Sequence, residues 1–264
     1  MVVLALLMTQ TMLAKSHKTR ISIFADHIVT IAQQEKIPFE EAARRVREMG
    51  YEGVDVRTNI DPQQLETLDR LGFQHACAIA DLAWAKGDIR AMEQQALDFC
   101  KREGYKTLLY VPVLMPQEGD EEAREALLKD IQAFARKCKK QKVDVMVEDY
   151  DNKRSICLDS HSIGQIFQVA PTVNHVFDTG NYLYAGEDAQ QVLKMFRKRI
   201  HHVHLKDRNK DMSCPAVGHG MLPIGAMMDE LSGHGYHGWW TVEHFGSRHM
   251  LQDAEKSIRY LLTR

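Results

Sequence analysis

The stretch VDVMVEDY, residues 143–150, decides the fold of this chain, because it joins a buried strand to an acidic end. Its three valines lie at every second position, and Asp144, Met146 and Glu148 lie between and after them. Successive side chains of a strand point to opposite faces, so the valines suit a face covered by helices. The stretch therefore predicts a buried parallel strand that delivers Glu148, on the other face, at its carboxyl end.

Three later apolar runs also carry a polar donor at their last residues. The runs and their donors are NHVFD with Asp178, HHVHL with His204, and WWTVE with Glu243. Alone, such a carboxylate commonly caps a helix or forms a salt bridge, and such a histidine is commonly structural. All four donors, however, lie at the alternate strand positions whose side chains point inward. The carboxyl ends of parallel strands also meet at one edge. The coincidence favours a single site.

Short β-branched runs alternate with helical patterns along the chain, which indicates βα units and a parallel sheet. The predicted strands are 21–25, 53–57, 75–80, 107–113, 143–149, 174–179, 201–207 and 239–244. The predicted helices are 38–50, 61–72, 88–104, 121–141, 160–170, 188–199, 224–235 and 251–262. Several of these helices begin with Pro, Asp or Ser, as capping prefers.

Eight such units fit either a closed barrel or an open doubly wound sheet. Asp55 and Arg57 alternate inward on a strand that would be apolar on both faces in an open sheet, which favours closure. No glycine-rich phosphate loop follows the first strand, so the usual dinucleotide fingerprint is missing. We therefore predict an α/β protein with one domain, a (β/α)8 TIM barrel over residues 20–264.

The first 19 residues are expected to form a loose extension. Their apolar run lacks a positive start and a well-formed cleavage site, so it makes a poor signal peptide, and it is too short to span a bilayer. The five cysteines lack a CxxC spacing and are typical of reduced, structural thiols. We expect a cytoplasmic protein, with export as the alternative.

The charge balance argues against nucleic acid as a partner. The chain has 34 basic and 36 acidic residues, whereas proteins that hold nucleic acid through its phosphates usually have a basic excess. Neither nucleic acid nor a membrane is therefore expected as a partner, which leaves a small molecule.

The four strand-end donors comprise three carboxylates and one imidazole. Such a hard set suits Mn²⁺ first, then Mg²⁺ or Co²⁺, and also accommodates Zn²⁺. We therefore predict one divalent cation, with Glu148, Asp178, His204 and Glu243 as its ligands.

Together, these motifs resemble a known family. Glu in VEDY, Asp in FDTGN, His in VHLKD and Glu in VEH, on the fifth to eighth strands, resemble the xylose isomerase-like TIM barrel superfamily. Within it, the chain is similar to the sugar (phosphate) isomerase/epimerase group, which includes tagatose 3-epimerase-like enzymes. The resemblance covers residues 20–264. It does not identify a substrate, because epimerases, isomerases, an inosose dehydratase and endonuclease IV share this scaffold.

The resemblance implies a reaction and roles for the donors. In the epimerases that the chain resembles, a metal holds the carbonyl oxygen and a neighbouring hydroxyl of a ketose, between two glutamates. Carried onto this chain, Glu148 and Glu243 become the acid/base pair of a sugar or sugar-phosphate epimerase/isomerase that works through an enediolate. Two bases on the two faces of a carbon invert that stereocentre, whereas one base that moves a proton between adjacent carbons isomerises a ketose to an aldose. Both outcomes stay open. By analogy, the resemblance also suggests a homodimer.

Two other functions remain as alternatives. A metal-dependent lyase or dehydratase would use the same enolate to expel a leaving group from a keto-sugar or inosose-type substrate. A carbohydrate-binding barrel would keep the fold without turnover. Three residues after Asp178, the epimerases and endonucleases of this scaffold often have histidine, whereas this chain has Asn181. An endonuclease is disfavoured, because it also needs histidines at the ends of the third and fourth strands, which here read AIADLAW and YVPVL.

Six further residues near strand ends are candidate substrate contacts: Asn181, Lys206, Arg57, His27, Lys210 and Trp84. Asn181 can hydrogen-bond a hydroxyl group, and Trp84 can stack on a sugar face or simply pack. Lys206 has the parity of His204 and can contact substrate or pair with Glu243. Salt bridging or capping is the alternative for Arg57 and His27. The remaining histidines of these strand ends, His201, His202, His244 and His249, are interpreted as structural or surface residues.

Overall fold

The computed structural model describes residues 19–264, and a closed barrel of parallel strands in sequential order lies at its centre. The strands are β1 (Arg20–Phe24), β2 (Gly53–Arg57), β3 (Gln74–Asp81), β4 (Thr107–Val111), β5 (Asp144–Glu148), β6 (Asn174–Asp178), β7 (Ile200–Leu205) and β8 (Trp239–Val242). The barrel closes where β1 pairs with β8, with Ile21 opposite Trp240. The predicted TIM barrel is confirmed.

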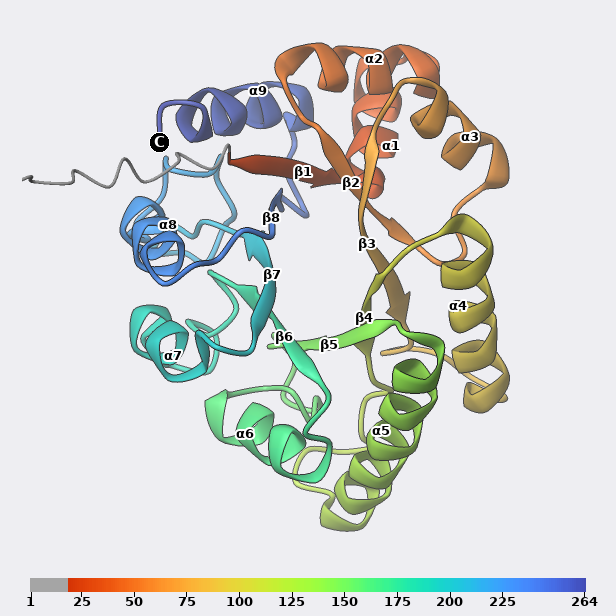
Figure 1. Ribbon diagram of the computed structural model, residues 1–264. Helices are drawn as coiled ribbons and strands as arrows, with labels where there is room; N and C mark the ends of the chain where they lie inside the picture. The colour runs from red at the N-terminus through yellow and green to blue at the C-terminus, as the bar shows by residue number, and fades with distance from the viewer. Residues whose placement is uncertain (1–18) are drawn as a thin grey trace, which may run out of the picture.

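Helices surround the barrel on its outer face (Figure 1). They are α1 (Ala25–Glu35), α2 (Phe39–Met49), α3 (Pro62–Arg70), α4 (Ile89–Glu103), α5 (Glu121–Gln141), α6 (Ser160–Val169), α7 (Ala189–Phe196), α8 (Ile224–Gly233) and α9 (Met250–Leu261). Five of them start after an aspartate whose side chain accepts a hydrogen bond from a backbone amide of the first turn. These aspartates satisfy amides that have no partner within the helix.

Helix α1 was not predicted, and Ala25, expected at the end of the first strand, begins it. Its N-cap residue is Phe24, which offers no side-chain hydrogen bond, and its first half is rich in β-branched residues. Both features lower the local signal for a helix. Packing compensates for them, because Ile28 and Ile31 are fully buried.

The barrel interior is apolar on one side and polar on the other. The apolar cluster inside the barrel comprises Phe24, Cys77, Ile79, Ala83, Leu109, Val111, Leu114, Met146 and Val176. The valines of β5 belong instead to the outer cluster beneath the helices, as their parity predicted. Polar residues of β2, β7 and β8, among them Asp55, His202 and Thr241, are buried on the other side.

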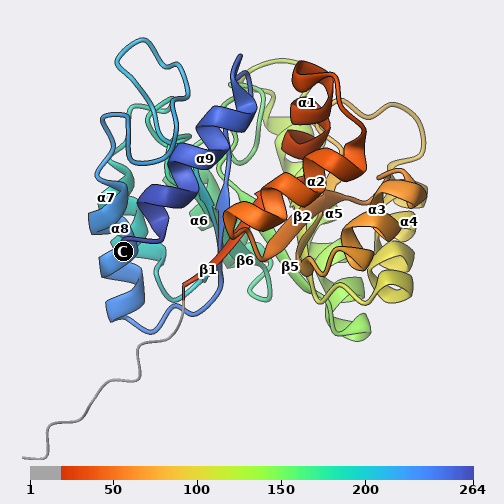
Figure 2. The same ribbon diagram turned by 90° about the horizontal axis from the view of Figure 1, so that it is seen from above.

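The long loop between β7 and α8 projects at one end of the barrel (Figure 2). Of the predicted loose extension, only Thr19 lies among the described residues. Across residues 19–264, no helix combines the length and apolar character needed to cross a lipid bilayer.

Candidate metal and catalytic site

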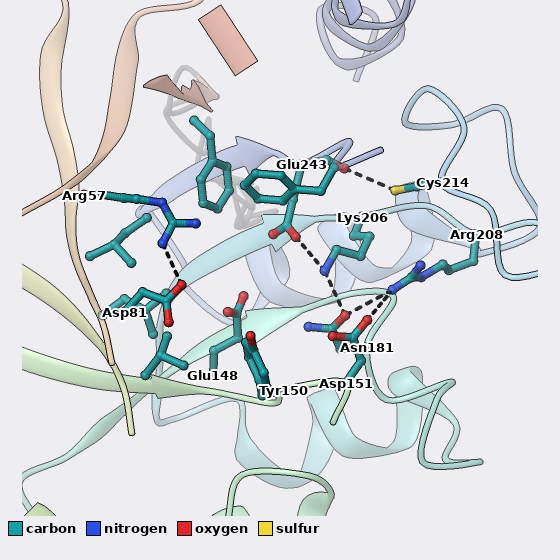
Figure 3. Close-up of a pocket in the computed structure, with 15 residues that line it drawn as sticks. Arg57, Asp81, Glu148, Tyr150, Asp151, Asn181, Lys206, Arg208, Cys214 and Glu243 are labelled. Atoms are coloured by element: carbon teal, nitrogen blue, oxygen red, sulfur yellow. Dashed lines mark hydrogen bonds and ion pairs between the residues drawn. The ribbon is translucent and has the colours of Figure 1, made fainter. Parts of the chain in front are cut away.

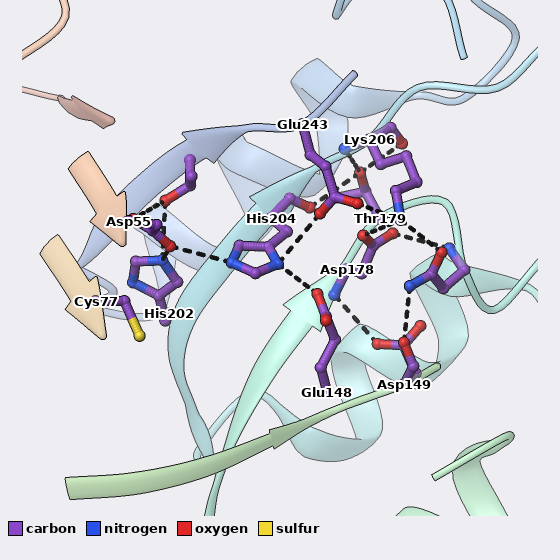
Figure 4. A network of polar contacts seen from close by, with 12 residues as sticks. Asp55, Cys77, Glu148, Asp149, Asp178, Thr179, His202, His204, Lys206 and Glu243 are labelled. Atoms are coloured by element: carbon purple, nitrogen blue, oxygen red, sulfur yellow. Dashed lines mark hydrogen bonds and ion pairs between the residues drawn. The ribbon is translucent and has the colours of Figure 1, made fainter. Parts of the chain in front are cut away.

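The four predicted donors converge at the carboxyl end of the barrel (Figure 4). Glu148 and Asp178 are the last residues of β5 and β6, His204 lies one residue before the end of β7, and Glu243 directly follows β8. One ligand atom from each of the four lies within 4.8 Å of those of the others. The fold thus assembles the set from four consecutive strands.

The donor set fits a divalent cation. Asp178 is fully buried, and its Oδ1 accepts hydrogen bonds from the amides of Gly180 at 2.7 Å and Asn181 at 2.8 Å. Its Oδ2 accepts no hydrogen bond and lies 3.0 Å from Lys206 Nζ. Two buried carboxylates and the partly buried Glu148, this close together, need compensating positive charge, which Lys206 supplies in part and a hard cation would complete.

His204 is oriented by a buried carboxylate on β2. Its Nε2 lies 3.2 Å from Asp55 Oδ2, and because a carboxylate only accepts, this nitrogen must donate. Burial alone would raise the pKa of Asp55, but His202 and His204 outweigh it and lower that pKa. Nδ1 of His204 therefore faces Glu148, with which it is hydrogen-bonded, and Glu243, whose Oε2 lies 3.3 Å away.

A second group of potential ligands, Asp55, Cys77 and His202, lies deeper in the barrel. Asp55 also accepts hydrogen bonds from His202 Nε2 at 2.7 Å and from the Thr241 hydroxyl at 3.0 Å. Burial, and then the charge of Asp55, raises the pKa of the Cys77 thiol well above its usual value, so the thiol keeps its proton. Of this group, Asp55 is hydrogen-bonded to His204 and is itself held by His202.

Lys206 lies between two of the predicted ligands. Its Nζ is 2.6 Å from Glu243 Oε1 and 3.0 Å from Asp178 Oδ2, and it donates to Asn181 Oδ1 at 2.8 Å. The contact with Glu243 is the pairing considered from the sequence. The Asn181 amide group also donates to the backbone oxygen of Asp149 at 2.8 Å. Lys206 and Asn181 thus form a polar wall beside the four donors.

The two glutamates differ in their electrostatic environment. Burial raises the pKa of Glu148, and the charge and hydrogen bond of His204 offset only part of that effect. Burial would also raise the pKa of Glu243, but Lys206 and His204 outweigh it and lower that pKa. Burial raises the pKa of Asp178 to about 7, against the opposing charge of Lys206. Of the two glutamates, Glu148 holds a proton more readily.

A cavity of about 300 Å³ opens beside the donors (Figure 3). Glu148, Glu243, Asn181, Lys206 and Arg57 line it. An apolar arc, defined as Phe24, Ile79, Leu109, Val111 and Phe245, forms the rest of the wall together with other residues. The cavity therefore has a polar side that carries the donors and an apolar side formed mainly by strands β1, β3 and β4.

The other predicted substrate contacts lie in different places. His27 is fully buried, and its Nε2 accepts a hydrogen bond from the backbone amide of His244 at 2.8 Å. Trp84 is 65% exposed, and the Arg154 guanidinium lies 5.1 Å from its ring centre. Lys210 is exposed in the β7–α8 loop. None of His27, Trp84 and Lys210 is among the residues that line this cavity.

Several lining residues were not singled out from the sequence. Asp81, at the end of β3, lines the cavity together with Tyr150 and Asp151, and so does Arg208, which the sequence had placed in the loop after the seventh strand. Asp81 carries the same signal as the predicted donors, an acid at the end of a strand. Arg208 Nη2 donates to Asp151 Oδ2 at 3.1 Å, a contact between two loops that 57 positions of sequence separate. Sequence spacing gives no signal for such a contact.

A closed parallel barrel with oxygen and imidazole donors gathered at its carboxyl end defines a (β/α)8 barrel with a candidate metal centre. The family model of the xylose isomerase-like TIM barrel matches residues 43–264, so the chain belongs to that family. The resemblance inferred from the four strand ends is confirmed.

Three similar proteins illustrate the range of this family. An inosose dehydratase of Geobacillus thermodenitrificans is 35% identical over 89 residues, which span 27% of this chain and 30% of the relative. The crystal structure of a probable 3-DHS dehydratase from Bacillus anthracis has a TM-score of 0.74 at 13% identity and covers 93% of this chain and 100% of its own. A D-allulose 3-epimerase from Methylomonas sp. has a TM-score of 0.71 at 16% identity, with 94% and 98% covered. At these identities, the two structures show a common fold.

Proposed function

We propose that this protein is a metal-dependent enzyme that moves a proton next to the carbonyl group of a sugar or sugar derivative, as an epimerase or isomerase. One observation carries the proposal: Glu148 and Glu243 both belong to the four-donor cluster and both line the cavity. A carbon held in the cavity would thus lie within reach of two carboxylates and beside a cation site.

Glu148, Asp178, His204 and Glu243 would hold the cation, with Mn²⁺ as the first choice. When bound, a divalent cation supplies Lewis-acid polarisation of a carbonyl group, which makes the adjacent C–H bond more acidic. Asp55 keeps Nδ1 of His204 turned toward this point. The protein's part is thus to fix the four donors before a substrate arrives.

The two glutamates would handle the proton. Glu243, paired with Lys206, is held in its charged form and would accept the proton from carbon. Glu148 has a raised pKa and approaches from a different strand, so it is suited to return a proton. Removal of the proton from carbon by one glutamate and delivery of a proton to the opposite face of that carbon by the other would invert a stereocentre. Return of the proton by the same glutamate to the neighbouring carbon would instead isomerise the sugar.

The cavity would bind one small molecule. Its volume of about 300 Å³ lies at the lower end of the range of about 300–1,000 Å³ for small-molecule sites, which suits a single sugar ring or open-chain sugar. Lys206 and Asn181 offer polar contacts beside the reacting carbon, and Arg57 offers one on the opposite side of the cavity. We expect the apolar arc to contact the C–H faces of the sugar.

A lyase acting on a keto-sugar or inosose-type substrate is the second candidate, favoured by the 35% identity to an inosose dehydratase. In that reaction a glutamate takes the proton from the carbon next to the carbonyl. The electron pair forms a C=C bond, and the C–O bond to the next carbon breaks. The leaving hydroxide takes a proton from an acid and departs as water. The same residues suffice for this outcome.

Solvent deuterium exchange tests the proposal. The Mn²⁺-loaded protein is incubated in deuterated water with a panel of ketoses, keto-glycosides and inosose-type cyclitols, and NMR identifies the products. An epimerase or isomerase gives an isomer with deuterium on carbon, whereas a lyase gives a product that has lost water. Exchange with none of the panel would contradict the proposal.

Variants of the two glutamates make the test specific. We expect Glu148→Gln and Glu243→Gln to lower turnover by roughly 10²–10⁴-fold, because an amide cannot exchange the proton. Glu118→Gln, which changes an exposed glutamate outside the cavity, is the control. Full activity in either cavity variant would remove that glutamate from the chemistry.

A further inference from the structure

Each basic side chain that lines the cavity is already paired with a carboxylate. On the side of β2, Arg57 donates from Nε to Asp26 at 3.0 Å. It also donates from Nη1 to Asp81 at 2.6 Å (Figure 3). Two carboxylates thus hold one guanidinium, and this corner of the cavity carries a net negative charge. Arg57 can still donate to a hydroxyl group, but it brings no surplus positive charge to the site.

The other two cations lie on the opposite side and are also neutralised. Lys206 Nζ lies within 3.0 Å of carboxylate oxygens of Asp178 and Glu243. Arg208 donates from Nη2 to Asp151 at 3.1 Å and from Nη1 to the backbone oxygen of Met212 at 2.9 Å. Arg208 has a single carboxylate partner among these contacts, and that partner is itself a lining residue.

Three backbone amides of the β7–α8 loop are occupied as well. The loops after the seventh and eighth strands of such barrels frequently hold phosphate groups through backbone amides. Here the amides of Gly218, Gly220 and Leu222, in the β7–α8 loop, donate to the side chain of Asp207 at 3.0, 2.8 and 3.1 Å. A carboxylate of the chain itself therefore occupies the place that an anion would take in this loop.

The overall charge of the lining agrees with these pairings. The lining contains four carboxylates, of Asp81, Glu148, Asp151 and Glu243, and three cations, of Arg57, Lys206 and Arg208. Asp26 and Asp178 add two further carboxylates in contact with those cations. Even with a divalent cation bound, the site has no positive excess. A phosphate monoester, which carries about −1.5 to −2 charges at pH 7, would have to break existing ion pairs to bind.

We infer that the substrate is an uncharged keto-sugar or keto-polyol, and that Asp151, by neutralising Arg208, makes the cavity discriminate against phosphorylated analogues. This inference rests on the proposed function. The apolar arc agrees with it, because Phe24, Ile79 and Leu109 offer contact to C–H groups and no donor to an anion. Asp151 is the residue to change, since its side chain is 39% exposed and is not one of the four donors.

The test compares a neutral ketohexose with the same ketohexose carrying a 6-phosphate. Binding to the Mn²⁺-loaded protein is measured by calorimetry, with inorganic phosphate as a third probe, and deuterium exchange is measured separately. For the wild-type protein we expect at least about tenfold tighter binding of the neutral sugar, which corresponds to about 1.4 kcal/mol. Asp151→Asn frees Arg208 and should shift this ratio about tenfold toward the phosphate.

Two control variants accompany Asp151→Asn. Asp151→Glu keeps a carboxylate for Arg208 and should keep the preference for the neutral sugar. Asp211→Asn changes an exposed aspartate of the β7–α8 loop that bonds to Ser213, and it should leave the ratio unchanged. Thermal unfolding of each variant shows whether it is folded.

The outcomes separate this inference from the proposed function. Tighter binding of the phosphorylated sugar, binding of neither sugar, or an unchanged ratio in folded Asp151→Asn would overturn the inference. Binding of the neutral sugar without deuterium exchange would support the inference and contradict only the proposed reaction.

Discussion

Asp55 lies below the cavity, and its influence on the chemistry passes through His204. By accepting from Nε2 of that histidine, it fixes the tautomer that turns Nδ1 toward the other three donors. It is itself held by His202 and Thr241, and the Thr241 hydroxyl is 2.6 Å from that of Ser22. A chain of buried hydrogen bonds across β1, β2, β7 and β8 thus ends at the four-donor cluster.

Asp55→Asn should weaken Mn²⁺ binding about 10–100-fold, which is the usual effect of losing such a partner of a metal-binding histidine. The side-chain amide of the variant can turn its NH₂ group toward His204, so it no longer determines which ring nitrogen of His204 carries the proton. Isothermal titration calorimetry with Mn²⁺ measures the effect. Asp69→Asn, which changes a partly exposed carboxylate 2.8 Å from His75 Nε2, is the matched control. Equal affinities of the Asp55 variant and the wild type would show that Asp55 has only a structural role.

At the scale of residues, strand parity predicted which side chains point inward but not which of them touch. Asp55 and Arg57 were both placed on the inward face, yet Asp55 pairs with a strand across the barrel, whereas Arg57 pairs with Asp81 of the neighbouring β3 and with Asp26 of α1. Asp55 reaches β7, 147 positions away at His202. The pairing of Lys206 with Glu243 was within reach of the sequence, because both lie near the carboxyl ends of neighbouring strands.

The β7–α8 loop is ordered by one aspartate at its start. Asp207 is fully buried and accepts from the amides of Arg208, Gly218, Gly220 and Leu222. Gly220 permits this close approach, because a Cβ atom there would lie 2.3 Å from Asp207 Oδ1. The loop therefore folds back onto its own first residues and places Arg208 at the cavity wall.

Asp207→Asn should loosen this loop, because one acceptor oxygen is replaced by an NH₂ group that cannot bond to the amides. We expect a loss of roughly 1–3 kcal/mol in the free energy of unfolding, as for other buried groups left without a partner. Hydrogen exchange at Gly218, Gly220 and Leu222 should become faster. Asp211→Asn, in the same loop, serves as the comparison. Unchanged protection of those three amides would contradict this account of the loop.

At the scale of elements, the predicted helices and strands were recovered where capping and periodicity agree. Helix α5 begins after Asp120, which accepts from the amide of Ala123, and its pattern is plain in the sequence. Helix α1 lacks a side-chain cap and relies on tertiary burial, which a sequence pattern does not report. The contact of Arg208 with Asp151 was hidden for a related reason, since it joins two irregular loops.

The whole molecule assembles the candidate metal site, because its four donors come from strands separated by up to 95 positions between Glu148 and Glu243. A cation that binds this site only in the folded chain stabilises the fold by RT ln(1 + [L]/Kd), about 2.7 kcal/mol at a hundredfold excess over Kd. Thermal unfolding should therefore shift upward with Mn²⁺ and downward with a chelator. A melting temperature that changes with neither Mn²⁺ nor the chelator would favour a carbohydrate-binding barrel without turnover.

The closed barrel itself was predictable from inward polar residues and from donors on four consecutive strand ends. An open sheet would have spread those donors along one edge, whereas closure curves β5 to β8 around one point. The shape of the cavity was not predictable, because it depends on how side chains such as Phe24 and Phe245 pack over the mouth.

The two halves of this barrel contribute different parts of the cavity. All four donors come from β5 to β8, whereas four of the five residues of the apolar arc come from β1, β3 and β4. Recombination that exchanged the first half for that of another family member would thus replace the apolar arc and Arg57 and keep the four donors and the Asp151–Arg208 pair. Asp55 is the exception, since it comes from the first half and serves the second. A first half taken from another family member would therefore need a carboxylate at the position of Asp55.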